Sequence, residues 1–109
     1  MGKERKLIIK EAAWKDLENE LEYLTENYSK TYALKFAVEF VDIVETIPVD
    51  YLHHPENRYL RTKNQVYRNI IWKKNYWIVY KIKPNTLEVL SLFHTKRNPK
   101  IIKKVKRIR

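Results

Sequence analysis

Apolar residues recur every three or four positions in two consecutive stretches of the chain, which is the pattern of amphipathic helices. The first stretch starts at Glu11, and Ser29 is placed to cap the start of the second. Pro48 is expected to end the second helix, because proline disrupts a helix interior. The short connection predicts an antiparallel hairpin laid across a sheet. The apolar positions are Trp14, Leu17, Leu21 and Leu24, followed by Tyr32, Phe36, Phe40, Ile43 and Ile47.

Four shorter stretches have the apolar or alternating character of β-strands. They are residues 6–10, 66–72, 76–82 and 87–94. Together with the helices they predict a single α+β domain over residues 1–109. It would have an N-terminal strand, an antiparallel helical hairpin packed on one face of a small, mainly antiparallel sheet of about four strands, and a basic C-terminal tail.

The last three predicted strands carry apolar residues on both of their faces, although an antiparallel sheet commonly buries only one. The hairpin can cover one face, so we expect the other to expose apolar surface that a partner segment would cover. The tail, residues 100–109, combines many cations with Ile101, Val105 and Ile108 at helical spacing. We expect it either to dock on the sheet as a short helix or to become ordered on a partner.

Residues 48–64 form a long connection with two prolines and no sustained period, and connections of this length are commonly functional. Its cations are Arg58, Arg61 and Lys63. The adjacent His53 and His54 do not indicate a metal site, because neighbouring side chains of an extended loop point apart and few acids lie nearby in the sequence.

Charge is distributed unevenly along the chain. Residues 1–56 hold seven Lys or Arg and twelve Asp or Glu, whereas residues 57–109 hold sixteen Lys or Arg and Glu88 alone. The halves therefore carry −5 and +15, which sum to the formal net charge of +10. A half with so few acids favours a polyanionic partner such as nucleic acid or the ribosome, because neutralisation of phosphates drives such binding.

The composition excludes several functional classes. There is no cysteine, and therefore no disulfide, thiolate metal site or cysteine nucleophile. Gly2 is the only glycine, which excludes glycine-rich phosphate loops. No apolar run approaches the roughly 20 residues that cross a bilayer, and the first ten residues lack the apolar core of a secretory signal. We expect a cytoplasmic protein without a metal or other cofactor.

The order of elements and several short motifs resemble the RelE/ParE superfamily of type II toxin-antitoxin toxins over nearly the whole chain. The matching segments are Ala12–Leu17 leading to Glu22–Leu24, Tyr67–Arg68, Ile78–Lys81 and Leu92–Pro99. The resemblance implies a cognate antitoxin protein as a partner. A segment of that antitoxin would wrap the toxin and cover its surplus apolar surface.

RelE-like members of the superfamily cleave mRNA on the ribosome, a reaction that needs an acid, a base and cations for the phosphorane charge. By this resemblance, Arg68 and Arg97 would stabilise charge, and His94 would be the acid or base because it titrates near neutrality. Other cations would contact RNA phosphates. They are Arg58, Arg61, Lys63 and Lys96. A common site requires Arg68, His94 and Arg97 to converge at one rim of the sheet.

Two alternatives to a ribonuclease remain open. Many RelE-like nucleases have a functional tyrosine near the C-terminus, whereas no tyrosine follows Tyr80 here. The spacing of His94 and Arg97 also resembles ParE-like members, which inhibit DNA gyrase without a catalytic set. A basic RNA-binding module without toxicity is a third possibility. We favour the ribonuclease, because a titratable histidine lies among arginines, and place the gyrase inhibitor second.

Overall fold

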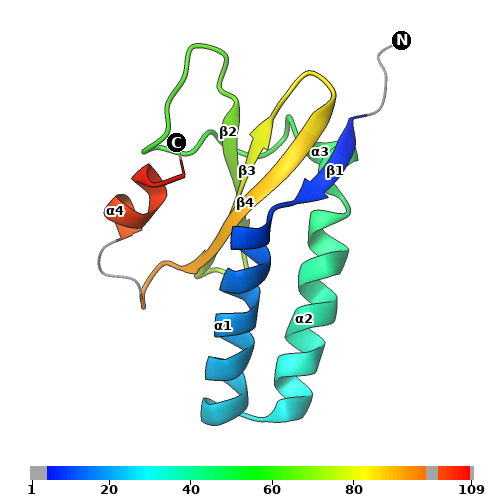
Figure 1. The fold of residues 1–109 in the computed structure, drawn as a ribbon, viewed down its shortest axis with the longest axis vertical. Coiled ribbons are helices and arrows are strands. Elements are labelled where there is room, and N and C mark those ends of the chain that lie inside the picture. Colours follow the sequence, from blue (N-terminus) through cyan, green and yellow to red (C-terminus); the bar gives the residue numbers. More distant parts are fainter. Residues whose placement is uncertain (1–4, 98–100, 109) are drawn as a thin grey trace.

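The computed structural model describes residues 5–97 and 101–108, and it has the predicted α+β architecture (Figure 1). A helical hairpin covers one face of a four-stranded sheet of order β1-β4-β3-β2. β1 runs parallel to β4, and the other two pairs are antiparallel. The elements are β1 (Lys6–Ile9), α1 (Glu11–Asn27), α2 (Lys30–Val44), α3 (Ile47–Asp50), β2 (Tyr67–Trp72), β3 (Tyr76–Ile82), β4 (Thr86–His94) and α4 (Ile101–Lys106).

The helical hairpin follows the sequence pattern closely except at the end of α2. The Ser29 hydroxyl accepts a hydrogen bond from the Tyr32 N–H at 3.0 Å and caps the helix as predicted. The prediction that Pro48 ends α2 is wrong. The helix already ends at Val44, and Pro48 lies in the first turn of the one-turn helix α3, where a missing N–H costs no hydrogen bond.

The main core fills the space between the hairpin and the sheet. Side chains from α1 and α2 meet those of β3 and β4 that point to the same face. Aromatic rings make up much of this core, and Phe36 packs against both Trp72 and Tyr76 at centroid distances of 4.8 and 5.1 Å. Its largest fully buried members are Tyr80, Phe36, Phe40, Ile47, Ile78 and Leu87.

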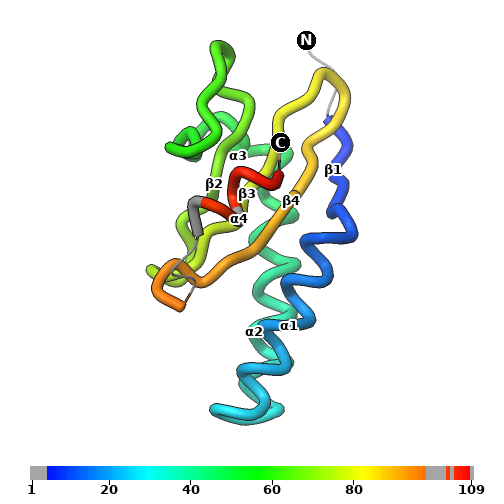
Figure 2. Tube along the Cα trace, turned by 60° about the vertical axis from the view of Figure 1, so that its left-hand side comes forward, coloured from blue at the N-terminus to red at the C-terminus, as the bar shows by residue number. Residues whose placement is uncertain are grey.

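A second, smaller core covers the opposite face of the sheet. Leu60 from the long connection and Val105 from α4 are both fully buried against Tyr67, Val79 and Phe93. In the view of Figure 2, α4 lies over β3 and β4. Of the two alternatives expected for the tail, docking on the sheet as a short helix is the one found for its described part, Ile101–Lys106. The expectation that this face exposes apolar surface for a partner segment is wrong for much of the face, because the protein covers it itself.

The long connection is held against the edge of β2 and not left extended. Glu56 forms a bridge with Arg68, Asn57 donates its N–H to the Tyr67 carbonyl at 2.8 Å, and Asn69 donates to the Pro55 carbonyl at 3.0 Å. These bonds occupy the first half of the outer β2 edge, which would otherwise present unpaired backbone groups.

α1 completes the edge of β4 where β1 ends. β1 pairs with β4 only as far as Val89, and a bulge follows at Leu90. Beyond it, the Asp16 carboxylate accepts hydrogen bonds from the Leu92 N–H at 3.0 Å and the Ser91 hydroxyl at 2.6 Å. The carboxylate thus takes the place of a strand and fixes α1 against the C-terminal half of β4.

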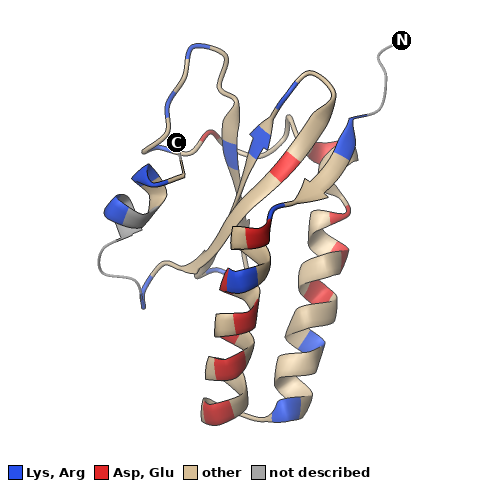
Figure 3. Ribbon diagram, in the orientation of Figure 1, with Lys and Arg blue, Asp and Glu red and all other residues tan. Residues whose placement is uncertain are grey.

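The charged residues are also distributed unevenly over the folded molecule (Figure 3). Acidic residues concentrate on α1, whereas cations lie on the long connection, at the sheet ends and on α4. No helix in residues 5–97 and 101–108 is long and apolar enough to cross a membrane.

Candidate functional site

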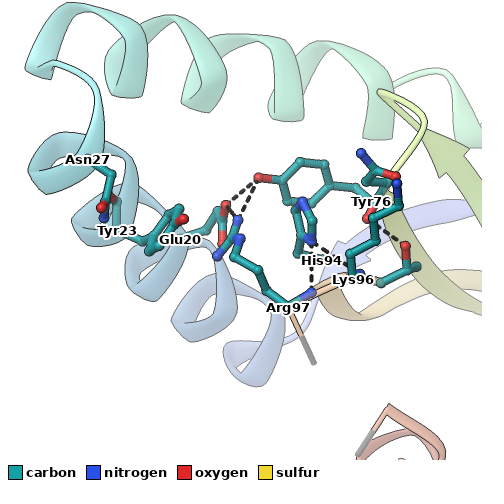
Figure 4. Close-up of polar contacts among 9 residues, drawn as sticks. Glu20, Tyr23, Asn27, Tyr76, His94, Lys96 and Arg97 are labelled. Carbon is teal, nitrogen blue, oxygen red and sulfur yellow. Dashed lines mark hydrogen bonds and ion pairs between the residues drawn. The ribbon is translucent and has the colours of Figure 1, made fainter. Parts of the chain in front are cut away.

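Arg97 lies at the centre of a polar cluster between α1 and the end of β4 (Figure 4). Its guanidinium Nη2 donates to the Glu20 carboxylate and, at 3.1 Å, to the Tyr76 hydroxyl. The Tyr76 hydroxyl in turn donates to the same Glu20 oxygen. The Arg97 guanidinium carbon lies 3.7 Å from the centroid of the Tyr23 ring, which is cation-π geometry. Side chains of two elements, α1 and β3, therefore converge on one arginine in the turn after β4.

The electrostatics of this cluster keep the Tyr76 hydroxyl and the Arg97 guanidinium protonated. Burial, followed by the hydrogen bond to Glu20, raises the pKa of Tyr76, so its hydroxyl keeps the proton that it donates. Burial opposes the charge on Arg97, but the hydrogen bond and the negative charge of Glu20 outweigh it and raise the arginine pKa. Glu20 consequently neutralises the cation that the sequence had suggested for phosphorane charge.

His94 stabilises the turn that positions Arg97. Its Nδ1 accepts hydrogen bonds from the backbone N–H groups of Lys96, at 3.2 Å, and Arg97, at 3.1 Å. The ring packs edge-on against Tyr76 with the centroids 4.9 Å apart. Burial, followed by the charge of Arg97, lowers the His94 pKa. The ring is therefore neutral at neutral pH, and the lone pair of Nδ1 accepts the two backbone hydrogen bonds.

Two small hollows lie beside Arg97. One, of about 240 Å³, is lined by residues that include Asp16, Asn19, Glu20, Tyr23, His94 and Arg97. The other, of about 220 Å³, is lined among others by Tyr28, Tyr32, Lys73 and Asn75, and it also touches His94 and Arg97. His94 and Arg97 line both hollows, and the carboxylates of Asp16 and Glu20 accompany them in the first. Within the described ranges, no three His, Asp or Glu side chains group as a metal site would require.

Arg68 lies at the other end of the sheet, so the prediction of a common rim is wrong for this residue. It pairs with Tyr80 across β2 and β3, whereas His94 pairs with Tyr76 across β3 and β4. Four residues along β3 separate these positions by about 13 Å at about 3.3 Å per residue. The strand register therefore keeps Arg68 away from Arg97.

The guanidinium of Arg68 holds the long connection in place. It donates to the backbone carbonyls of Gln65 at 3.1 Å, Leu52 at 3.1 Å and His54 at 2.9 Å. Carbonyls before and after the bend of the connection thus share one cation. Arg68 therefore stabilises the conformation of the long connection.

The four cations predicted to contact RNA do not form one group either. Arg58, Arg61 and Lys63 are on the long connection, on the side of the second core. The Arg58 guanidinium covers the Tyr59 ring at 5.2 Å, and Arg61 lies 4.0 Å from Glu56. Lys96 is on the turn after β4, beside His94. Only Lys96 of the four is near the cluster around Arg97.

Comparison with known proteins identifies the family of this chain. The sequence model described as the ParE toxin of the type II toxin-antitoxin system parDE matches residues 7–99. The chain belongs to this family. Among solved structures, one titled "Chromosomal ParDE TA system from P. aeruginosa" has a TM-score of 0.70 at 14% identity, covering 84% of this chain and 96% of that one. This likeness shows a shared fold. No curated protein matches the chain.

Membership of the ParE family confirms the resemblance to RelE/ParE toxins that the motifs indicated. The chain is the toxin of a type II toxin-antitoxin system, which implies an antitoxin as its partner.

Three members of the cluster in this ParE-family chain escaped the sequence reasoning. They are Glu20, Tyr23 and Tyr76. A signal for the first two exists in the sequence, because Asp16, Glu20 and Tyr23 repeat at four and three residues along one flank of the apolar stripe of α1. Such a polar row beside a buried face indicates a helix flank that bonds to a neighbouring element. Tyr76 has no comparable signal.

The neutral ring of His94 makes the stability of this ParE-family toxin depend on pH. Its folded pKa lies below the ordinary value of 6.5, so the unfolded chain binds more protons and stability falls as the pH drops below 6.5 toward the folded pKa. We expect His94→Asn, whose side-chain oxygen can replace Nδ1 as acceptor, to reduce this loss. Urea unfolding at pH 5.5 and 7.5 measures it. His54, whose pKa burial also lowers, leaves a residual dependence. An unchanged pH difference in the variant would contradict this role of His94.

Proposed function

We propose that this toxin stops growth by binding DNA gyrase and inhibiting it, without a catalytic set of its own. The ParE family name and the fold shared with a ParDE system support this choice over the ribonuclease that we favoured from the sequence. The antitoxin would neutralise the toxin by occupying its surface.

The observation that carries the proposal is the bonding of Arg97 to Glu20. A ribonuclease needs a cation that is available to the developing phosphorane charge. Here the carboxylate of Glu20 and the hydroxyl of Tyr76 already take up the guanidinium, and the Tyr23 ring covers it. Arg68 is bonded to three backbone carbonyls at the opposite end of the sheet. The hydrogen bonds of Arg97 and Arg68 favour structural roles for both residues over catalytic ones.

The histidine supports the same proposal. A general acid must carry a proton at the pH of the reaction, and the lowered pKa of His94 works against that. A general base needs an available lone pair, and Nδ1 already accepts two backbone N–H groups. One observation favours the ribonuclease, namely that His94 and Arg97 line the same two hollows. It remains the second candidate.

Supercoiling of relaxed plasmid by purified gyrase tests the proposal. We expect the purified toxin to inhibit supercoiling, and we expect its cognate antitoxin to restore it. In parallel, primer extension on ribosome-bound mRNA should show no new ends. Normal supercoiling together with toxin-dependent mRNA cleavage would overturn the proposal and establish the ribonuclease. The reading frame beside the gene is expected to encode the antitoxin.

A further inference from the structure

The side of the molecule opposite the helical hairpin carries a dense set of cations, which we call the basic face. Its members surround the second core and come from the long connection, from β3 and from the C-terminal segment around α4. They are Arg58, Arg61, Lys63, Lys81, Lys103, Lys106 and Arg107. All are exposed except Lys81, which is half-buried where its amine lies over the Tyr67 ring.

The second core fixes the parts of the basic face relative to one another. Leu60 and Val105 are both fully buried against the sheet, so the connection and α4 share one apolar base. Ile108 and Tyr59 pack around the same cluster. The cations therefore project from a fixed surface, which reduces the conformational entropy lost when a rigid ligand binds.

Acidic side chains do little to offset this charge. Residues 57–108 contain Glu88 as their only acid, and its carboxylate lies 3.1 Å from the amine of Lys83. Glu56, at the start of the connection, lies near Arg61 and also accepts the Thr62 N–H. Asp16 of α1 lies at the β4 edge and lines a hollow together with Arg107, whereas the other acids of α1 lie along the hairpin (Figure 3). The basic face thus has a strong positive potential.

The aromatic residues of this side are used for packing. Tyr59 and Trp77 contact each other at 6.1 Å, Trp77 contacts Phe93 at 6.5 Å, and all three belong to the second core or pack against it. Cations cover two ring faces, since Arg58 lies over Tyr59 and Lys81 over Tyr67. Proteins that bind single strands offer open rings on which bases stack. This arrangement favours contacts to a phosphate backbone over contacts to splayed bases.

We propose that the basic face binds the phosphate backbone of duplex DNA without base specificity. A rigid array of cations suits a duplex, whose phosphates also have fixed spacing. The choice of DNA rests on the proposed function, because a gyrase inhibitor acts where gyrase holds DNA. The basic face would then anchor the toxin on the DNA of the gyrase complex, while other surfaces contact the enzyme.

Fluorescence anisotropy with a labelled duplex of about 20 base pairs tests the proposal in the absence of gyrase. The first variant combines Lys63→Gln, Lys103→Gln and Lys106→Gln on the basic face. The matched control combines Lys15→Gln, Lys30→Gln and Lys35→Gln, which are exposed on the hairpin. Each triple variant lowers the formal net charge by three, from +10 to +7. Circular dichroism checks that both variants fold.

We expect log K to fall linearly with log salt for the unmodified toxin between about 50 and 200 mM. The slope should become shallower by about 0.9 for each phosphate that the variant no longer neutralises, so by nearly 3 in the basic-face variant. The control should keep the original slope and affinity. Equal losses of affinity in both variants would mean that net charge alone drives binding, and would overturn the proposal.

Two competitors test the identity of the polyanion. Single-stranded RNA of the same length should compete less well than the duplex, and so should poly-glutamate at equal charge. Better competition by RNA would assign the face to RNA, and better competition by poly-glutamate would assign it to an acidic protein. Either result overturns this inference without bearing on supercoiling. Conversely, DNA binding by a toxin that leaves gyrase active would overturn the proposed function alone.

Discussion

Phe40→Ala is expected to lower the free energy of unfolding by about 3 to 5 kcal/mol, the range typical of removing a large aromatic side chain from a core. The Phe40 side chain is fully buried in the main core, with Trp14 and Trp72 at centroid distances of 6.4 and 6.1 Å. Truncation removes apolar burial and leaves a cavity that the closely packed hairpin and sheet cannot collapse to fill. Urea denaturation followed by circular dichroism measures the change.

Trp14→Ala is the control for this prediction. Trp14 contacts the same ring but is 41% exposed, so it contributes less burial although it is the larger residue. We expect a destabilisation clearly smaller than that of Phe40→Ala. Equal effects would show that the interior of the hairpin is not packed as described.

Glu20→Ala is expected to lower the free energy of unfolding by about 2 to 3 kcal/mol. The substitution leaves the Arg97 guanidinium without its carboxylate and the Tyr76 hydroxyl without its acceptor. The value lies below that of a fully buried pair, because the Arg97 side chain is 30% exposed and solvent screens its charge. Equilibrium unfolding in urea again provides the measurement.

Glu22→Ala provides a matched control on the same helix. Glu22 is exposed, and its replacement should change the stability by no more than about 0.5 kcal/mol. If Glu20→Ala were equally mild, the cluster around Arg97 would contribute little to the fold, and Arg97 would not have the structural role described above.

The fold was largely predictable because most elements follow from local pattern. Apolar spacing defined α1 and α2, and Ser29 had both the residue type and the position of an N-cap. Pro48 misled the prediction because proline both ends helices and begins them, and only tertiary packing decides which. Val105 could be placed on an apolar stripe, but its burial against Leu60 depends on the path of a connection that has no period.

The candidate site was predictable only in part. Arg68 lies near the start of β2 and His94 at the end of β4, and these two strands run in the same direction on either side of β3, so the predicted antiparallel strands with short turns already place the two residues at opposite ends of the sheet. The sequence could place His94 close to Arg97, because the two residues are three positions apart and a tight turn suffices to bring them together. The carboxylate that neutralises Arg97 comes from Glu20, 77 residues earlier, and the sequence alone could not pair these two residues.

These contacts change the functional interpretation of the residues that suggested catalysis. A histidine between arginines indicated acid-base chemistry, yet each of the three side chains has a bonding partner that explains its position. Exposed cations gather instead on the basic face, where they can meet a partner. We therefore infer a toxin that acts by binding, in which the cluster around Arg97 maintains the shape of the molecule.

Growth arrest by the double variant Glu20→Gln/Arg97→Gln tests this central claim most directly. The two amides can keep hydrogen bonds to each other and to Tyr76 while both charges are lost, and replacing both partners of an ion pair commonly costs little stability. With circular dichroism confirming the fold, we predict that inducing the variant without its antitoxin still arrests growth. A folded variant that no longer arrests growth would show that the charge of Arg97 acts on the target, and would contradict the claim that Arg97 is structural.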